Sequence, residues 1–265
     1  MTVTNPDFVD IEYIWPSHFE SPTLVVGIGG GSDVISAYLL STMLLHYSAQ
    51  VLYGNTKRRA KTLDWISPHI GTLPEAIDEP VDLRKAHNTT LIDSSVPRNE
   101  NGSPYIFVLP NLSVKEDMVQ EILGMGVSSI LAVDTGGDVL KFFDKSYKRR
   151  NGRDLQMLEV LKATGIPTQL MVVGLGSDGE LQPQRITKLI RTAMKDGSYA
   201  GCFSLMEHMD ALEQLADGLP ATRTPSIILN AARLKDTHTE VFVPRDLKPT
   251  IPIAWLTRAF VFNIQ

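Results

Sequence analysis

The sequence is poor in cysteine, with Cys202 alone among 265 residues. A single cysteine excludes an intrachain disulfide, and it excludes a zinc site built from several cysteines at short spacing. Cys202 lies in an apolar, strand-like run, where a buried and unreactive thiol is expected. The stability of the fold must therefore come from the burial of apolar side chains, without covalent cross-links.

Long hydrophobic runs are also missing. The longest begins near Val34 and is interrupted by Ser41, Thr42 and His46, so it falls short of the roughly 20 apolar residues that cross a membrane. Residues 1–7 have neither the basic nor the apolar segment of a secretory signal. We therefore expect a cytoplasmic protein that does not bind membranes.

The chain has no excess of basic residues, and its formal net charge is −5. Compact basic runs occur only at residues 57–59 and 148–150, and each lies beside a loop. Binding to nucleic acid requires a basic patch or stripe on one face of the protein, so we expect no nucleic-acid partner. The six histidines show no spacing typical of metal ligands, and we expect them to be structural.

Apolar side chains are abundant, at 43% of the residues, which is enough to bury a large core. Strand-like runs alternate along the chain with segments of helical period. Strands are predicted at 23–26, 50–53, 90–93, 105–109, 129–133, 168–173 and 240–243, and helices at 33–47, 113–123, 154–163, 183–194, 204–216 and from 224 onward. This alternation predicts an α/β fold with a doubly wound, mostly parallel, Rossmann-like sheet in three layers.

We expect residues 1–265 to form a single α/β domain. A less regular excursion is predicted at about 58–104, where five prolines and the polar loop 98–103 occur. Ser113 with Glu116, and Ser204 with Glu207, have the spacing of a capping box. Each of these serines is therefore predicted to cap the helix that follows it.

Three loops rich in glycine and acidic residues follow three of the predicted strands. They are residues 27–33 (Gly-Ile-Gly-Gly-Gly-Ser-Asp), 134–138 (Asp-Thr-Gly-Gly-Asp) and 174–180 (Gly-Leu-Gly-Ser-Asp-Gly-Glu), called here the first, second and third loops. The carboxyl ends of parallel strands share one edge of the sheet, where ligands bind in α/β folds. We therefore predict that the three loops form one pocket for a small molecule.

The first loop has the composition of an anion-binding turn. The N–H groups of Gly29, Gly30 and Gly31, with the start of the following helix, are expected to bind an anionic group, and Ser32 is a further ligand-binding candidate. Asp33 would repel a phosphate unless a cation lay between them. It is therefore expected either to hold Mg²⁺ or to bind a ligand hydroxyl or amine, and the alternative is that it caps the helix.

The first loop also departs from the dinucleotide-binding fingerprint. Gly27 and Gly29 would require a third glycine at position 32, which is Ser32. The next strand is followed by Asn55 and Lys57, and not by an acid that could hold a ribose hydroxyl. Neutral and basic residues there would suit a 2′-phosphate, so NADP remains an alternative ligand and Asn55 a ligand-binding candidate.

The second loop places two acidic residues, Asp134 and Asp138, around two glycines that permit a ligand to approach closely. Two carboxyl groups facing one small space can share a metal ion or a proton, or one can act as a general base. We predict Asp134 and Asp138 as the catalytic pair, with Asp138 also a Mg²⁺ ligand. Thr135, Gly136 and Gly137 are ligand-binding candidates. The alternative is that both acids only cap the backbone of the turn.

The third loop follows the most hydrophobic strand and should open on the same sheet edge. Its ligand-binding candidates are Gly176, Ser177, Asp178 and Glu180. The two acids are expected to contact ligand hydroxyls or a metal ion, although Asp followed by Gly also forms simple turns. Arg153 and Asp154 either border this pocket or cap a helix.

The three loops carry a resemblance to a known family. The stretches Gly-Gly-Gly-Ser-Asp ending at Asp33, Val-Asp-Thr-Gly-Gly-Asp ending at Asp138 and Gly-Leu-Gly-Ser-Asp-Gly-Glu-Leu from Gly174 resemble the motifs of an uncharacterised family of bacterial and archaeal cytoplasmic proteins, a domain of unknown function. The resemblance runs from about residue 20 to the C-terminus. It implies a Rossmann-like α/β domain but no activity.

The loops together predict an enzyme, or a specific binder, of a small polar and anionic metabolite: a phosphorylated compound, a sugar or an amino acid. Mg²⁺ is the candidate cofactor. Two other classes stay open, an NADP-dependent oxidoreductase and a non-catalytic ligand sensor or assembly protein. A homo-oligomer is expected from the general frequency of such assemblies.

Overall fold

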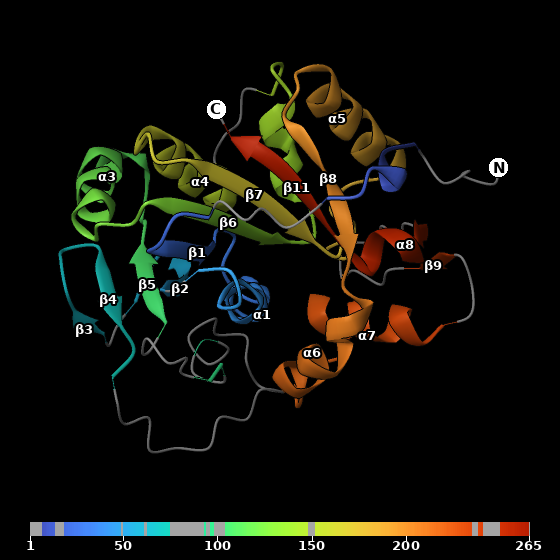
Figure 1. Ribbon diagram of the computed structural model, residues 1–265, viewed down its shortest axis with the longest axis horizontal. Helices are drawn as coiled ribbons and strands as arrows, with labels where there is room; N and C mark the ends of the chain where they lie inside the picture. Colours follow the sequence, from blue (N-terminus) through green and yellow to red (C-terminus); the bar gives the residue numbers. More distant parts are fainter. Residues whose placement is uncertain are drawn as a thin grey trace.

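The computed structural model describes residues 7–13, 19–48, 50–60, 63–74, 93, 96–97, 104–147, 152–234, 238–240 and 250–264. Its main sheet contains β1 (Thr23–Gly27), β2 (Val51–Lys57), β3 (Asp64–Trp65), β4 (Ile70–Thr72), β5 (Tyr105–Val108), β6 (Ser129–Thr135), β7 (Thr168–Val173), β8 (Tyr199–Ser204) and β11 (Arg258–Ile264). These nine strands lie in the order β3-β4-β5-β2-β1-β6-β7-β11-β8 (Figure 1). Two further strands, β9 (His238–Glu240) and β10 (Thr250–Pro252), form a separate antiparallel pair.

The centre of the sheet is parallel. The strands β5, β2, β1, β6 and β7 are neighbours in this order and run in one direction. Chain order therefore reverses between β1 and β6, as in a doubly wound dinucleotide-binding fold. The predicted Rossmann-like α/β fold is confirmed. At the two edges the pairing is antiparallel: β4 pairs with β5, and β11 pairs with both β7 and β8.

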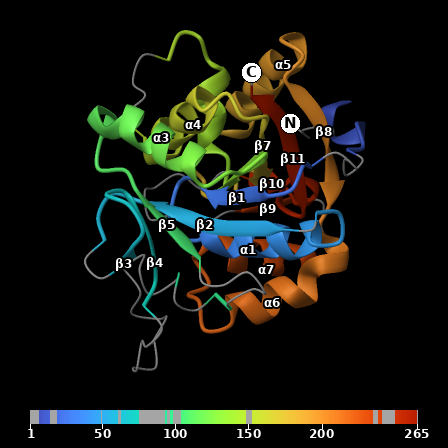
Figure 2. The same cartoon turned by 60° about the vertical axis from the view of Figure 1, so that its left-hand side comes forward.

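Helices cover both faces of the sheet (Figure 2). They are α1 (Asp33–Leu44), α6 (Met209–Ala216) and α7 (Thr224–Arg233) on one face, and α3 (Lys115–Gly124), α4 (Arg153–Ala163) and α5 (Pro183–Lys195) on the other. The short helix α8 (Ile253–Leu256) leads into β11, and 3₁₀ turns occur at η1 (Asp7–Asp10), η3 (Leu112–Val114), η4 (Asp138–Phe143) and η5 (Met206–His208). The arrangement has the three layers expected.

The central strands are apolar on both faces. In β1, Leu24 and Val26 pack beside α3 and α4, while Val25 packs beside α1, and all three side chains are fully buried. The same alternation holds in β6, β7 and β11. Successive side chains of a strand point to opposite faces, so a strand covered on both sides needs a continuous apolar run. Each such side chain contributes about 1.5–3 kcal/mol by burial.

Two predicted capping boxes are wrong. Before α3, Asn111 is the capping residue, because its Oδ1 accepts the N–H of Ser113 at 2.8 Å, and the 3₁₀ turn η3 precedes the helix. Ser204 Oγ accepts the N–H of Met206 at 3.2 Å, but the residue that caps η5 is Leu205, and α6 begins only at Met209. In both places a 3₁₀ turn delays the start of the α-helix.

Strand β2 extends four residues beyond its predicted end at Tyr53. The residues that read as loop, Asn55 and Lys57, are buried because both contact Asp93: the Asn55 Nδ2 donates to its Oδ1 at 2.7 Å, and Lys57 forms an ion pair with it. The strands β3, β4, β8 and β11 were not predicted.

Several predictions concern segments outside the described residues. Residues 90–92 of one predicted strand lie there, and Asp93 is not in a strand. The polar loop 98–103, the basic run 148–150 and residues 241–243 of the last predicted strand also lie there.

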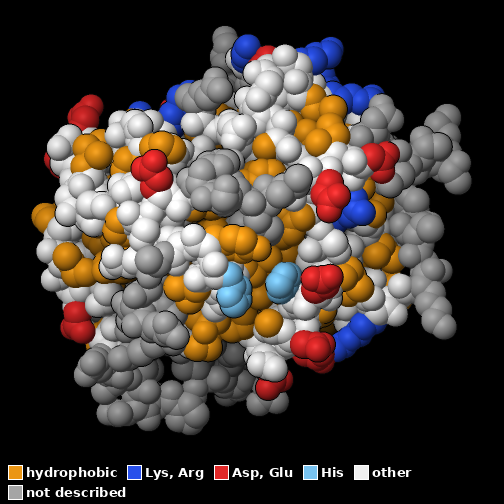
Figure 3. All heavy atoms as spheres, in the orientation of Figure 1, with side chains coloured by type: hydrophobic (Ala, Val, Ile, Leu, Met, Phe, Trp, Pro, Cys, Tyr) orange, Lys and Arg blue, Asp and Glu red, His pale blue; other side chains and the backbone are white. Residues whose placement is uncertain are grey.

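No helix in the described part of the chain is long and apolar enough to span a membrane. On the face drawn in Figure 3, apolar side chains gather near the middle around histidines, and Lys and Arg side chains lie toward the periphery. Cys202 is buried, and its Sγ donates to the carbonyl of Val9 at 3.4 Å, as expected for an unreactive thiol.

Candidate functional site

The three glycine-acid loops lie at the carboxyl ends of the adjacent strands β1, β6 and β7, and they contact one another. The N–H of Thr135 donates to Asp33 Oδ1 at 3.2 Å, which joins the first loop to the second. The N–H of Gly176 donates to the carbonyl of Gly136 at 2.5 Å, which joins the third loop to the second. The loops therefore meet beside the point where strand order reverses, the usual place for ligands in this fold.

Asp33 links two loops and is not a helix cap. It is the first residue of α1, and Ser32 precedes it as the capping residue without a side-chain hydrogen bond. The Asp33 carboxyl accepts the N–H of Gly29 at 2.6 Å in addition to that of Thr135. Burial raises the Asp33 pKa to about 8, against the effect of these hydrogen bonds and of Arg153. At neutral pH Asp33 therefore keeps its proton and does not repel an anion.

The first loop has a positively charged end. Gly30 and Gly31 adopt positive φ values of 76° and 61°, and the N–H groups of Gly30, Gly31 and Ser32 have no hydrogen-bond partner among the described residues. The guanidinium of Arg153, the first residue of α4, lies against Gly30, where a Cβ would be only 2.6 Å from its Cζ. The first loop thus brings three N–H groups and a helix start next to a guanidinium, a combination that can hold an anion.

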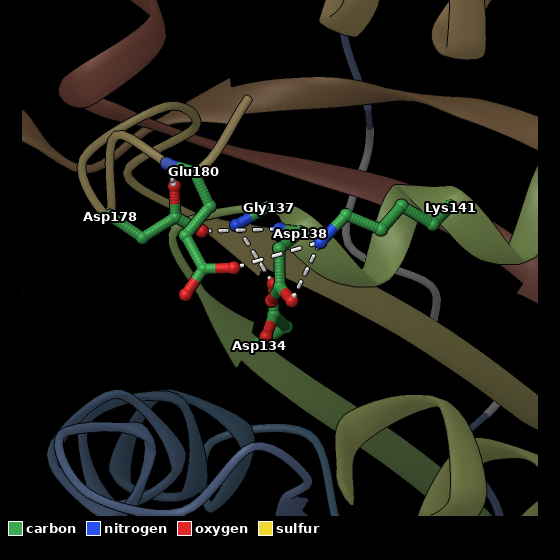
Figure 4. A network of polar contacts seen from close by, with 6 residues as sticks. All are labelled: Asp134, Gly137, Asp138, Lys141, Asp178 and Glu180. Carbon is green, nitrogen blue, oxygen red and sulfur yellow. Dashed lines mark hydrogen bonds and ion pairs between the residues drawn. The ribbon is translucent and has the colours of Figure 1, made fainter. Parts of the chain in front are cut away.

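The second loop carries two acids with different contacts (Figure 4). Asp134 is buried, and its Oδ2 accepts the N–H of Gly137 at 2.8 Å. Burial, followed by the charges of Asp138 and Asp33, raises the Asp134 pKa well above its usual range. Asp138 is 25% exposed and forms an ion pair with Lys141 at 3.2 Å.

Asp178 holds the third loop against the second. Its two carboxyl oxygens accept the N–H groups of Asp138 at 3.2 Å and Glu180 at 2.9 Å. A Cβ at Gly136 would lie 2.5 Å from Asp178 Oδ2, so only glycine allows this approach. Burial and the charge of Asp138 raise the Asp178 pKa to about 7. Glu180 is exposed at the rim, 3.6 Å from Lys141.

Other predicted ligand contacts are occupied by the protein itself. The hydroxyl of Thr135 donates to Ser36 Oγ of α1 at 2.9 Å. Gly176 packs on Ile251. Ser177 is an exception, because its hydroxyl is buried beside Gly174 but has no hydrogen-bond partner among the described residues. Asn55 is bound to Asp93, as described above.

Lys57, which the NADP alternative invoked, is fully buried in its ion pair with Asp93. Its ammonium therefore already has a counter-ion. The next residue, Arg58, donates from Nη1 to the carbonyl oxygens of Leu109 at 3.3 Å and Pro110 at 3.2 Å, and also bonds Gln156. Both basic groups at the end of β2 are thus bound within the protein.

Two further residues belong to the site. The sequence motifs did not identify Lys141, and they left open whether Asp154 borders the pocket or caps a helix. Burial lowers the Lys141 pKa, but Asp138 and Glu180 outweigh it and raise the pKa above its usual value. The spacing of Asp138 and Lys141, three residues apart in a helical turn, was the available signal. Asp154 is buried in α4, and burial, followed by the charge of Asp138, raises its pKa to about 6.

The predicted Mg²⁺ ligands, Asp33 and Asp138, do not form a ready-made metal site. Among the described residues, no three His, Cys, Asp or Glu side chains are grouped so as to hold a metal ion. Both oxygens of Asp33 accept backbone N–H groups, whereas Asp138 is partly exposed. Mg²⁺ often uses one or two carboxylates together with oxygens of the ligand, so Mg²⁺ bound by Asp138 and the ligand stays a prediction.

A second hollow lies away from the loops. A pocket of about 520 Å³ between the end of α1 and the end of β8 is lined by residues that include Tyr13, His46, Tyr47, Phe203 and His208. No residue of the three loops lines it. The histidines there are therefore separate from the site described above.

Comparison with known proteins gives one match. A family model described as "Protein of unknown function (DUF1152)" matches residues 110–259, which include the second and third loops. The match confirms the resemblance to a family of unknown function. No curated protein and no solved structure matches the chain.

Proposed function

Because this chain belongs to the DUF1152 family, whose function is unknown, the chemistry has to be inferred from the site, and we propose that the protein is an enzyme acting on a small, polar, anionic metabolite by proton transfer. The observation that supports this most strongly is that the buried Asp134, whose pKa is raised by burial and by the charge of Asp138, shares a loop with Asp138, which forms an ion pair with Lys141 where the three loops meet. The cytoplasm is the proposed location.

Asp134 is the proposed general acid and Asp138 the proposed general base. A buried carboxylic acid that keeps its proton at neutral pH can donate it to a developing anion, while a carboxylate in the same loop can accept a proton. Such positioned groups typically accelerate a reaction by about 10²- to 10⁴-fold. Lys141 would hold the Asp138 side chain in place through their 3.2 Å ion pair.

The anionic group of the metabolite would bind at the first loop. The N–H groups of Gly30, Gly31 and Ser32 point from the start of α1, where the helix dipole adds about half a positive charge. Arg153 adds a full charge beside Gly30. The protonated state of Asp33 supports this proposal, because a carboxylate there would oppose binding. Mg²⁺ stays part of the proposal as an ion bridging Asp138 and the ligand.

Thermal shift measurements test the proposal. Wild type and Asp138→Asn are heated with Mg²⁺, Mn²⁺, NADP, nucleotides, sugar phosphates and acidic amino acids. A ligand at about 100 times its Kd adds roughly 2.7 kcal/mol, which raises Tm by a few degrees. We expect a shift with wild type, none with Asp138→Asn, and an unligated Tm similar in both.

The matched control is Asp64→Asn, because Asp64 is an exposed acid of β3, outside the three loops. It should respond to ligands as wild type does. Equal ligand shifts for Asp138→Asn and wild type would contradict the proposal. A large fall in the Tm of Asp138→Asn without a change in binding would assign Asp138 a structural role.

A further inference from the structure

We propose that the acidic end of this site binds a protonated amine, so that the metabolite carries an amino group close to its anionic group. This inference rests on the proposed function and names the class of substrate. The groups that bind the amine are the carboxyls of Asp134, Asp138 and Asp154.

Each of these three carboxyls has one oxygen without a hydrogen bond to another described residue. They are Asp134 Oδ1, Asp138 Oδ1 and Asp154 Oδ2, since Asp134 Oδ2 binds Gly137 and Asp138 Oδ2 binds Lys141. Asp154 is the decisive member, because it is only 5% exposed and its Oδ2 is fully buried. A buried acceptor without a donor is unfavourable, so a ligand N–H that satisfies it binds favourably.

The three carboxyls lie on elements that pack against one another: Asp134 is in β6, Asp138 begins η4, and α4, which carries Asp154, contacts both. The charge of Asp138 is a major cause of the raised pKa values of Asp134 and Asp154, and Asp154 also acts on Asp134. Asp134 Oδ1 lies 3.5 Å from the position of a Cβ at Gly29, so it faces the first loop. In Figure 4 the carboxyls of Asp134 and Asp138 lie next to each other.

An ammonium group fits these acceptors better than a metal ion does. It has three N–H donors, which matches three unused carboxyl oxygens. The protein uses the same recognition at the rim of the site, where the ammonium of Lys141 lies 3.2 Å from Asp138 and 3.6 Å from Glu180. A metal ion would need oxygens grouped more tightly than the described residues provide.

The two ends of the site set the distance between the ligand's charges. Arg153 lies against Gly30, while Asp134 Oδ1 faces the adjacent Gly29. The anionic group and the amino group are therefore separated by a few bonds, as in amino acids or short aminoalkyl phosphates. Opposite charges at the two ends also fix the orientation of such a ligand.

NMR titration with small cations tests the inference without knowledge of the full ligand. Methylammonium provides N–H donors, whereas tetramethylammonium carries the same charge without them. The probes are added to wild type at constant ionic strength while the backbone amides of Gly137 and Asp138 are followed. We expect saturable shifts with methylammonium alone, and an apparent Kd raised by about tenfold or more in Asp154→Asn. Asp64→Asn should match wild type.

Three results would overturn the inference. Equal shifts with both cations would show that charge alone is recognised. Saturation by Mg²⁺ with no response to methylammonium would identify a metal site. No response to either cation would contradict the amine inference. The proposed function would still stand, because the thermal shift comparison of wild type with Asp138→Asn tests anionic ligands independently. If Asp154→Asn does not fold, the comparison of the two cations on wild type still shows whether the site recognises the N–H donors of an amine.

Discussion

At the scale of single residues, Asp154 is a buried acid whose ionisation opposes folding. Its pKa in the folded protein is about 6, raised first by burial and then by Asp138, whereas that of a free aspartate is about 4. A raised pKa favours the folded state fully below about pH 4, and this contribution is lost as the pH rises through about 6.

Asp154→Asn should therefore be more stable than wild type at pH 8, by at most about 3 kcal/mol, because the amide cannot ionise. The difference should vanish near pH 4. Urea denaturation at the two pH values measures it. A difference that does not depend on pH would contradict the raised pKa.

Gly30 is the residue where the backbone and Arg153 meet most closely. We expect Gly30→Ala to be destabilising for two reasons: its φ is 76°, and the new Cβ would lie 2.7 Å from the carbonyl oxygen of Thr56. Gly165→Ala is the matched control, because its φ is 71° and nothing lies within 4 Å of the added carbon. The control should lose about 1–2 kcal/mol, from backbone strain alone.

Gly30→Ala should lose a further 1–3 kcal/mol, roughly, from crowding. Denaturation curves of both variants give the comparison. Equal losses would mean that the contacts around Gly30 relax without cost.

At the scale of elements, hydrogen bonds join α1 to the end of β6. The Thr135 hydroxyl donates to Ser36 Oγ, and Asp33 of α1 accepts the Thr135 N–H. Thr135→Val should cost about 1–3 kcal/mol in unfolding free energy, because it leaves the buried Ser36 hydroxyl without this partner. Adding Ser36→Ala should recover part of the loss, and a double-mutant cycle measures the coupling. Strictly additive losses would show that the hydroxyl pair contributes nothing.

Elements with local signals were predictable, and those with distant partners were not. The apolar runs of β1, β6 and β7 identified these strands, and the parallel topology placed their loops on one edge. Asn55 and Lys57 read as loop because their partner, Asp93, is 38 residues from Asn55. The hydrogen bond from the Thr135 N–H to Asp33 joins residues 102 positions apart, so the sequence did not reveal that Asp33 binds the second loop. β11 was missed because its stability comes from pairing between β7 and β8.

At the scale of the whole molecule, Phe262 connects three parts of the fold. It is fully buried in β11, and its ring centroid lies 5.0 Å from that of Phe143 in η4 and 5.3 Å from that of Tyr199 in β8. Phe262→Ala should lower the unfolding free energy by about 3–5 kcal/mol, since a cavity opens at the junction. Leu234→Ala, at a side chain 43% exposed, should change it little. Urea denaturation of the two variants checks this, and similar losses would contradict a central role for Phe262.

The position of β11 affects how the protein folds while it is being synthesised. The ribosome makes β8 before β11, yet β11 lies between β7 and β8 in the sheet. At about 5–20 residues per second, the emerging chain therefore spends a few seconds with β8 unable to join the sheet and one side of β7 open. An open strand edge can pair with any neighbouring chain. The growing polypeptide is thus most vulnerable to aggregation just before β11 is synthesised, when much of the sheet already exists.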